Sequence, residues 1–86
     1  MYWIYILKSK KNNSLYIGAT SDLEKRIEQH NQGKSLATKK YLPWVLVYTE
    51  GYFLEKDAFD REHQLKHFGK VYAHLKRRIK NSLQSV

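Results

Sequence analysis

The stretch YWIYIL at residues 2–7 decides the fold of this chain. It is rich in β-branched and aromatic residues, and it is apolar at both odd and even positions. A strand with one face in water alternates apolar and polar residues, whereas a strand covered on both faces is apolar throughout. The stretch therefore predicts a central strand with a layer of structure on each side.

Turn, strand and helix signals elsewhere predict the remaining elements. A hairpin joins the first strand to a second over 15–19, and a third strand is expected over 44–49, stopped by Gly51. Later helices are expected over 55–67, ended by Gly69, and over the basic segment 70–82. The order β-β-α-β-α-α predicts an α/β (α+β) domain in which helices flank a three-stranded, largely antiparallel sheet.

The first helix has signals at both ends. Ser21-Asp22-Leu23-Glu24 has the form of a capping box, in which the Ser21 hydroxyl and the Glu24 carboxylate bond free amides at a helix start. Gly33 suits a left-handed residue that ends a helix. We therefore expect a helix over 22–31.

Length and composition limit the class of protein. Eighty-six residues suit one domain, 1–86, and 42% hydrophobic with 28% charged residues excludes disordered and membrane-spanning classes. The absence of cysteine excludes disulfides and thiolate zinc sites. The short apolar run at the N-terminus has no basic segment before it and no cleavage site after it, so we expect a cytoplasmic protein.

The charge indicates a polyanionic partner. Sixteen Lys and Arg against eight Asp and Glu give a net charge of +8. One basic cluster lies in the middle of the chain and another follows Glu62; the residues we expect to contact nucleic acid are Lys34, Lys39, Lys40, Lys66, Lys76, Arg77 and Arg78. A solvated surface would explain any single cluster, but the clusters together favour nucleic acid.

Glu62 occupies an unexpected position in the helix over 55–67. At about 100° per residue it falls about 40° from Ala58, inside the apolar stripe that Leu65 shares. An ionised carboxylate there needs a positive partner. An ion pair with Lys66 or Arg61, or a side chain that extends to water at the edge of the domain, is one interpretation. A Mg²⁺ ligand is the other, because this ion needs only one or two carboxylates when a substrate supplies phosphate oxygens.

Polar residues on the first helix and in the hairpin leave similar alternatives. Arg26 and His30 are i,i+4 neighbours beside the apolar stripe, where an arginine is usually a solvated charge and a histidine usually structural. The other interpretation is that they serve phosphate binding and proton transfer. Tyr5 and Tyr16 are either core residues or chemical groups, and a buried phenol needs a hydrogen-bond partner.

These residues also form a pattern. Trp3-Ile4-Tyr5, ten intervening residues and Tyr16-Ile17-Gly18 resemble the paired signature of the GIY-YIG nuclease family. Further matches follow in order: Arg26, His30, Gly33-Lys34, Thr38, Pro43, Leu46-Val47-Tyr48 and Glu62. The chain resembles the small stand-alone bacterial branch of that family, which is similar to the N-terminal nuclease domain in the C component of the ABC excinuclease.

The resemblance implies a metal-dependent endonuclease that hydrolyses phosphodiester bonds in DNA and selects structure more than sequence. Glu62 would hold Mg²⁺ or Mn²⁺, and Arg26 would steady the phosphate as negative charge builds. Tyr5 would position the attacking water. Either Tyr16 or His30 would accept its proton, and a phenol does so only if its pKa is depressed.

The sequence departs from the signature at two places: the first affects only the strand backbone, and the second supports an alternative. Trp3 replaces the first glycine, and Ala19-Thr20 stand where the family often has lysine. The alternative is a nucleic-acid-binding module that is catalytically weak or inactive. No recognition helix, zinc finger or stacking platform is evident in the sequence, so a protein partner is expected to supply target specificity.

Overall fold

Strand β1 (Tyr2–Ser9) lies at the centre of a three-stranded sheet, as the sequence predicts. Strands β2 (Leu15–Thr20) and β3 (Trp44–Tyr52) pair with it in antiparallel register in the order β2-β1-β3. The computed structural model describes residues 1–86. Side chains on both faces of β1 are buried, from Ile4 through Leu7, so the continuous apolar run reflects coverage on both sides.

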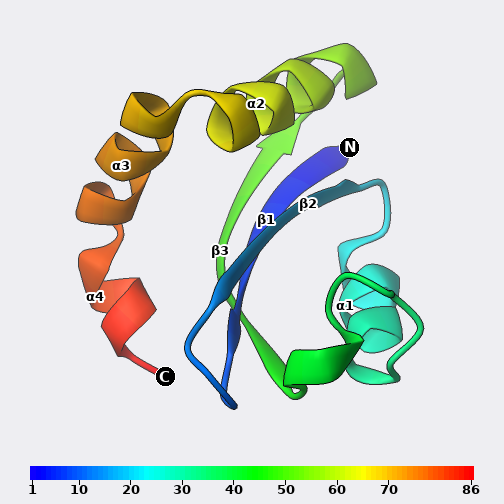
Figure 1. Ribbon diagram of the computed structural model, residues 1–86. Coiled ribbons are helices and arrows are strands. Elements are labelled where there is room, and N and C mark those ends of the chain that lie inside the picture. The colour runs from blue at the N-terminus through cyan, green and yellow to red at the C-terminus, as the bar shows by residue number, and fades with distance from the viewer.

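Helices form a layer on each face of the sheet (Figure 1). On one face lie three helices: α2 (Glu55–His67), α3 (Gly69–Arg78) and α4 (Lys80–Gln84). Ile4 and Ile6 pack there against Ala58 and Leu65 of α2. On the other face lie α1 (Leu23–Asn31) and the short 3₁₀ helix η1 (Lys39–Tyr41), over a cluster built on Tyr5. The predicted α+β class and element order are confirmed.

The start of α1 differs from the predicted capping box. Asp22, not Ser21, is the N-cap: its Oδ1 accepts the Lys25 amide at 3.1 Å. The Thr20 hydroxyl accepts the Asp22 amide at 3.1 Å, which holds Asp22 in the cap position and leaves Ser21 outside the helix. The predicted end is confirmed, because Gly33 has φ of 76° and its amide bonds the His30 carbonyl at 3.1 Å.

Other predicted boundaries were also wrong. Strand β3 runs through Gly51, whose missing side chain makes room for the Trp3 ring, since a Cβ there would lie 2.9 Å from it. Phe68, in extended conformation, ends α2, and Gly69 begins α3. The predicted helix over 70–82 is two helices that meet at Ile79. No helix has both the length and the apolar character needed to cross a membrane.

A polar cluster joins α2 to β3. Glu50 accepts hydrogen bonds from Tyr48 at 2.7 Å, from Tyr52 at 2.6 Å and from Arg61 Nε at 2.9 Å. Burial by itself raises the pKa of Glu50, but the hydrogen bonds from Arg61 and the two phenols outweigh burial and hold the pKa below its ordinary value. The ionised carboxylate therefore stabilises the fold.

We expect Arg61→Ala to lower the free energy of unfolding at pH 7 by about 1–3 kcal/mol, because it leaves Glu50 partly buried without its cation. Since the folded pKa of Glu50 is depressed, its stabilisation is complete above about pH 4 and is lost as the pH falls through the folded pKa. The variant should show a weaker loss of stability in acid. Urea denaturation across this pH range measures both effects.

Lys56→Ala is the matched control for Arg61→Ala. Lys56 pairs with Asp60 on the same helix, but its side chain is 82% exposed. Removal of this exposed pair should change stability by less than about 0.5 kcal/mol. Equal losses in the two variants would contradict a stabilising role for the Glu50 cluster.

Candidate active site

The Tyr5 phenol crosses the neighbouring strand at Gly18. These two residues are paired in the β1–β2 register, and a Cβ placed on Gly18 would overlap the Cζ and Oη atoms of Tyr5. Only glycine leaves room for the ring at this point. The close approach directs the phenol toward α1 and explains physically why glycine follows Tyr16-Ile17.

His30 holds the phenol in this position. Its Nε2 lies 2.8 Å from the Tyr5 hydroxyl, and its Nδ1 lies 2.8 Å from the Thr38 hydroxyl. A neutral imidazole has one donor and one acceptor nitrogen, so it can bond both hydroxyls at once. His30 and Thr38 are fully buried, and the Thr38 carbonyl accepts the Trp44 indole N–H at 2.8 Å. The chain after α1 is thereby fastened to the sheet.

Burial lowers the pKa of His30, and the positive charge of Arg26 lowers it further. The imidazole is therefore neutral at physiological pH. His30 therefore links the hydroxyl groups of Tyr5 and Thr38. This matches the structural histidine that was one of the two interpretations of the sequence.

Tyr16 lies beside this link at the rim of the sheet. Its ring is 5.1 Å from His30 and 6.4 Å from Tyr5, measured between centroids. The residue is only half-buried, because β2 is an edge strand. The Lys66 ammonium lies 5.9 Å from the Tyr16 ring centroid, so α2 reaches around the sheet edge to this phenol.

The electrostatics of Tyr5 show that four predicted residues gather at this rim. Burial raises the pKa of Tyr5 to about 12, and the Arg26 guanidinium opposes the rise. The charges of Tyr16 and Glu62 add to the rise. Arg26, half-buried on α1, also donates to Gln29 Oε1 at 3.2 Å. Side chains from β2, α1 and α2 therefore act on one phenol of β1.

Glu62 lines a hollow of about 250 Å³ between α2 and the end of β2, together with Thr20, Ser21 and Phe59. Its side chain is 20% exposed, and its Oε2 accepts from Lys66 Nζ at 3.1 Å. The predicted ion pair with Lys66 is confirmed. Its alternative, a pair with Arg61, is wrong, because Arg61 turns to Glu50 on β3.

The donor set at this hollow fits a hard cation that binds together with its substrate. No three His, Cys, Asp or Glu side chains gather into a metal cage in the chain. Mg²⁺ commonly takes one or two protein carboxylates and completes its shell with water and substrate phosphates. Glu62, open to the hollow and held by one exchangeable lysine, satisfies that requirement.

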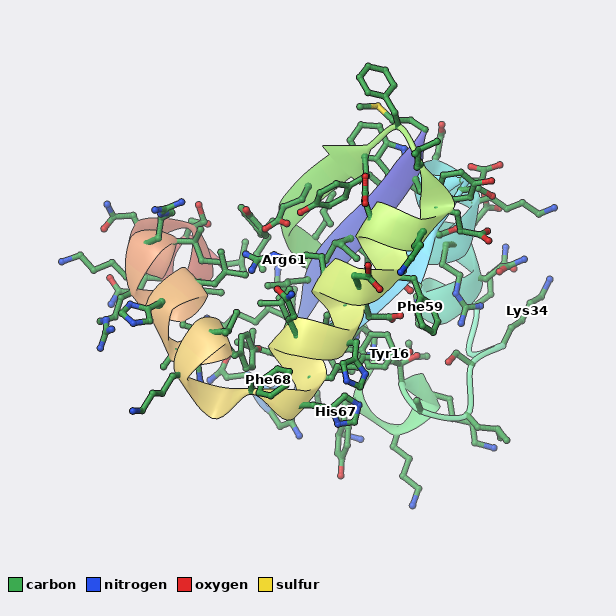
Figure 2. All side chains as sticks on the ribbon, turned by 90° about the horizontal axis from the view of Figure 1, so that it is seen from above. Tyr16, Lys34, Phe59, Arg61, His67 and Phe68 are labelled. Carbon is green, nitrogen blue, oxygen red and sulfur yellow. The ribbon has the colours of Figure 1, made fainter.

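The structure separates the predicted basic residues into two groups. Lys34 and η1, which carries Lys39 and Lys40, lie on the α1 side of the sheet, and Lys66 lies at the rim itself. The other group is on α3, which covers the opposite face (Figure 1). It comprises Lys76, Arg77 and Arg78. Figure 2 shows Tyr16 and Phe59 on one side of α2, with Lys34 extended beyond them.

Sequence reasoning did not find every residue of this site. Thr38 matches the family pattern, but nothing in the sequence indicated its bond to His30. Phe59 follows a buried alanine and has no periodic signal of its own. Gly18 was part of the motif without a physical role. Each of these roles comes from contacts between separate elements, and hydrophobic periodicity cannot show such contacts.

We expect Gly18→Ala to displace the Tyr5 ring and break its bond to His30, lowering the free energy of unfolding by about 1–3 kcal/mol. Chemical denaturation measures the loss, and NMR of the His30 ring reports the broken bond. The matched control is Gly69→Ala, where a Cβ meets nothing within 4 Å at the start of α3. It should be neutral or stabilising by up to about 1 kcal/mol. Equal stability of the two variants would contradict the close approach at Gly18.

We expect His30 to titrate below its ordinary pKa of 6.5. Because the folded pKa is depressed, its stabilisation is complete above about pH 6.5 and is lost as the pH falls through the folded value. NMR titration of the imidazole carbons measures the pKa. In parallel, His30→Gln should remove part of the stability loss below pH 6.5, and titration of His30 at or above 6.5 would contradict its burial between two hydroxyls.

Comparison with known proteins places the chain in a family. Residues 1–70 match the family model described as the GIY-YIG catalytic domain. The UPF0213 protein SH2523 of Staphylococcus haemolyticus is 43% identical over 70 residues, which are 80% of this chain and 84% of that protein. The UPF0213 protein SSP2268 of Staphylococcus saprophyticus is 41% identical over the same shares. The solution NMR structure of the UPF0213 protein BH0048 from Bacillus halodurans covers 99% of this chain and 95% of its own, with TM-score 0.59 and 28% identity. With these matches, and with the Tyr5 phenol placed over Gly18 beside Tyr16, the chain belongs to the GIY-YIG nuclease family, among its small UPF0213 members.

Proposed function

We propose that this protein is a metal-dependent endonuclease that hydrolyses phosphodiester bonds in DNA, acting in the cytoplasm through one domain over 1–86. One observation carries the proposal. Arg26 and Glu62 come from helices on opposite faces of the sheet, yet both act on the Tyr5 phenol, which crosses the edge strand β2 at Gly18 beside Tyr16. Packing alone gives no reason to gather a guanidinium, a carboxylate and two phenols, one buried and one half-buried, at one edge of the sheet.

Glu62 is the residue that would hold Mg²⁺ or Mn²⁺. When bound, the metal would neutralise charge on a phosphate oxygen and favour ionisation of a water. The carboxylate would exchange its 3.1 Å contact with Lys66 for the metal. The released ammonium would then be free to contact the phosphate. The family often has a lysine directly after the segment that matches Tyr16-Ile17-Gly18. Lys66 of α2 would supply the corresponding cation at the rim.

Arg26 would bind the phosphate that is cleaved. Its guanidinium has a planar array of donors that matches phosphate oxygens, and its charge opposes the negative charge that develops in the transition state. Arg26 is half-buried on α1, so its charge is less screened by water than that of an exposed arginine. A group held in place before reaction loses little free energy to reorganisation.

The two tyrosines and His30 would position the attacking water and accept its proton. Tyr5, with a pKa of about 12, stays protonated at neutral pH and would position the water as a hydrogen-bonding group. His30 is buried and bonded on both nitrogens, so we assign it to holding Tyr5. Tyr16 is the phenol at the open rim, with the Lys66 ammonium near its ring, and we propose it as the group that accepts the proton of the attacking water.

The cations on the α1 side would guide the DNA backbone into the site. Lys34, Lys39 and Lys40 share that side with Arg26, so one backbone could contact them together. The α3 group covers the other face and would contact a separate stretch of DNA or a protein partner that supplies specificity. Phosphate contacts of this kind weaken as salt rises and carry no base information.

A second function, nucleic-acid binding without cleavage, is favoured by one observation. Ala19 and Thr20, where the family often has lysine, line the hollow beside Glu62. If Lys66 does not replace that cation, the site would bind phosphate and hydrolyse it slowly or not at all. Binding would then be salt-dependent and indifferent to metal removal.

Cleavage of DNA tests the proposal directly. Purified protein with Mg²⁺ or Mn²⁺ is expected to cut at least one of supercoiled, single-stranded and branched DNA, and EDTA should abolish the activity. Glu62→Gln should lower the rate by at least about 100-fold, because it removes the carboxylate charge that the metal requires. Asp60→Asn is the matched control, since Asp60 is an exposed carboxylate on the same helix that pairs with Lys56.

Absence of cleavage on all three DNA forms, with binding that ignores EDTA and Glu62→Gln, would support the binding module and overturn the nuclease proposal. Equal loss of activity in Asp60→Asn and Glu62→Gln would indicate a general effect of charge on α2. Melting temperatures of both variants should match the wild type, because neither side chain is part of the buried core.

A further inference from the structure

Phe59 is an exposed aromatic residue beside the candidate active site. Its side chain lies on α2 one turn before Glu62, and the residue is 65% exposed. It lines the same hollow as Glu62. Figure 2 shows its side chain on the same side of α2 as Tyr16. A single exposed apolar side chain is common on protein surfaces and needs no explanation. The position of Phe59 in a shaped hollow at the proposed point of reaction sets it apart.

The hollow combines two kinds of chemistry. Tyr2 and Phe59 provide aromatic surface, and the hydroxyl groups of Thr20 and Ser21 and the carboxylates of Glu55 and Glu62 provide polar groups. At about 250 Å³ it is smaller than a site for a drug-sized molecule, which is roughly 300–1,000 Å³. Such a space suits one ring system and is too short for an extended apolar segment.

We propose that this hollow binds an unpaired nucleobase of the bound strand, stacked on Phe59, next to the phosphate that the active site holds. This inference rests on the proposed function, because the phosphate at Arg26 and Glu62 brings the base within reach. Base stacking on an aromatic side chain is tolerant of sequence, since every base has a π-face. Phe59 would therefore select unpaired structure without selecting a sequence.

Charge favours a base over an anionic occupant. Glu55 repels phosphate from the interior of the hollow, while Arg26 and Lys66 attract it to the rim. The base is uncharged, and its ring and exocyclic N–H groups can donate to Glu55 or to the two hydroxyls. A nucleotide would thus place its charge among the cations and its apolar ring on Phe59.

The base must be unpaired because both faces of a base in a duplex are covered by its neighbours. Stacking on Phe59 requires a base that has left the duplex, and this costs least where it is already mismatched, looped or single-stranded. The substrate class narrows to single-stranded DNA and to unpaired nucleotides in branched or bulged DNA.

Fluorescence of 2-aminopurine in a single-stranded oligonucleotide tests the stacking without cleavage. In EDTA and low salt, wild-type protein should bind the strand and quench the fluorescence. Phe59→Ala should weaken binding by about 5- to 100-fold and lose the quenching, whereas Phe59→Tyr should keep both within about 2-fold. The same strand in a perfect duplex should bind the wild type and Phe59→Ala equally. Phe53→Ala is the control, because Phe53 is 88% exposed and does not line the hollow.

The outcomes separate this inference from the nuclease proposal. If Phe59→Ala binds the strand and quenches its fluorescence as strongly as the wild type does, the stacking site is overturned, even where Glu62-dependent cleavage is observed. Quenching that depends on Phe59 would support the site even if no DNA is cut. Sedimentation without DNA tests whether a second copy of the chain covers Phe59. If the protein self-associates, and Phe59→Ala abolishes this without changing DNA binding, the inference is overturned. Since Phe59 is exposed, unchanged circular dichroism is expected for each variant.

Discussion

The contact between the Tyr5 phenol and the backbone of Gly18 is the constraint on which the site depends. Because no side chain stands at Gly18, the phenol crosses β2 and reaches His30, which in turn bonds Thr38. One chain of hydrogen bonds thus joins the central strand, α1 and the chain that follows α1. Burial of each member raises the cost of breaking any single bond, since a lost partner would leave a polar group without water.

The edge position of β2 explains how charges from two layers meet. Helices α1 and α2 cover opposite faces of the sheet, and a further strand beyond β2 would keep them apart. At the edge, Lys66 of α2 approaches Tyr16, while Arg26 of α1 acts on Tyr5. On the opposite edge, the Glu50–Arg61 cluster joins α2 to β3 and so holds the helix that carries Glu62. Stability at one edge therefore supports the geometry at the other.

The cations that give the net charge of +8 lie in separate groups on the surface of this fold. Cations near α1 and at the rim lie beside the proposed site, whereas those on α3 occupy another face. The hollow between α2 and the end of β2 is lined by carboxylates, hydroxyl groups and aromatic surface, and by no cation. In the binding mode that we propose, phosphates contact the rim and a base occupies the hollow. This would give an 86-residue chain a physical way to prefer unpaired DNA.

The order of elements, the covered central strand, the extent of α2 and the glycine end of α1 were all predictable, because periodicity and local backbone preferences determine them. The motif residues Tyr5, Tyr16, Arg26, His30 and Glu62 were identified from their order and spacing along the chain, which the sequence shows directly. The passage of β3 through Gly51 was not predictable, since it depends on packing against Trp3 of the neighbouring strand. The N-cap at Asp22 rests on local hydrogen bonds with Thr20 and Lys25 that compete with the predicted capping box. The break at Ile79 had no signal in the sequence. The sequence by itself determined which chemical groups the chain carries and on which helix or strand each of them lies. The pair of Glu62 with Lys66 is an i,i+4 contact on one helix, and the sequence predicted it as one alternative. Only the tertiary structure decided that His30 bonds Tyr5 and Thr38, that Arg61 pairs with Glu50, and that Phe59 lines a hollow, because these depend on distances between residues far apart in the chain.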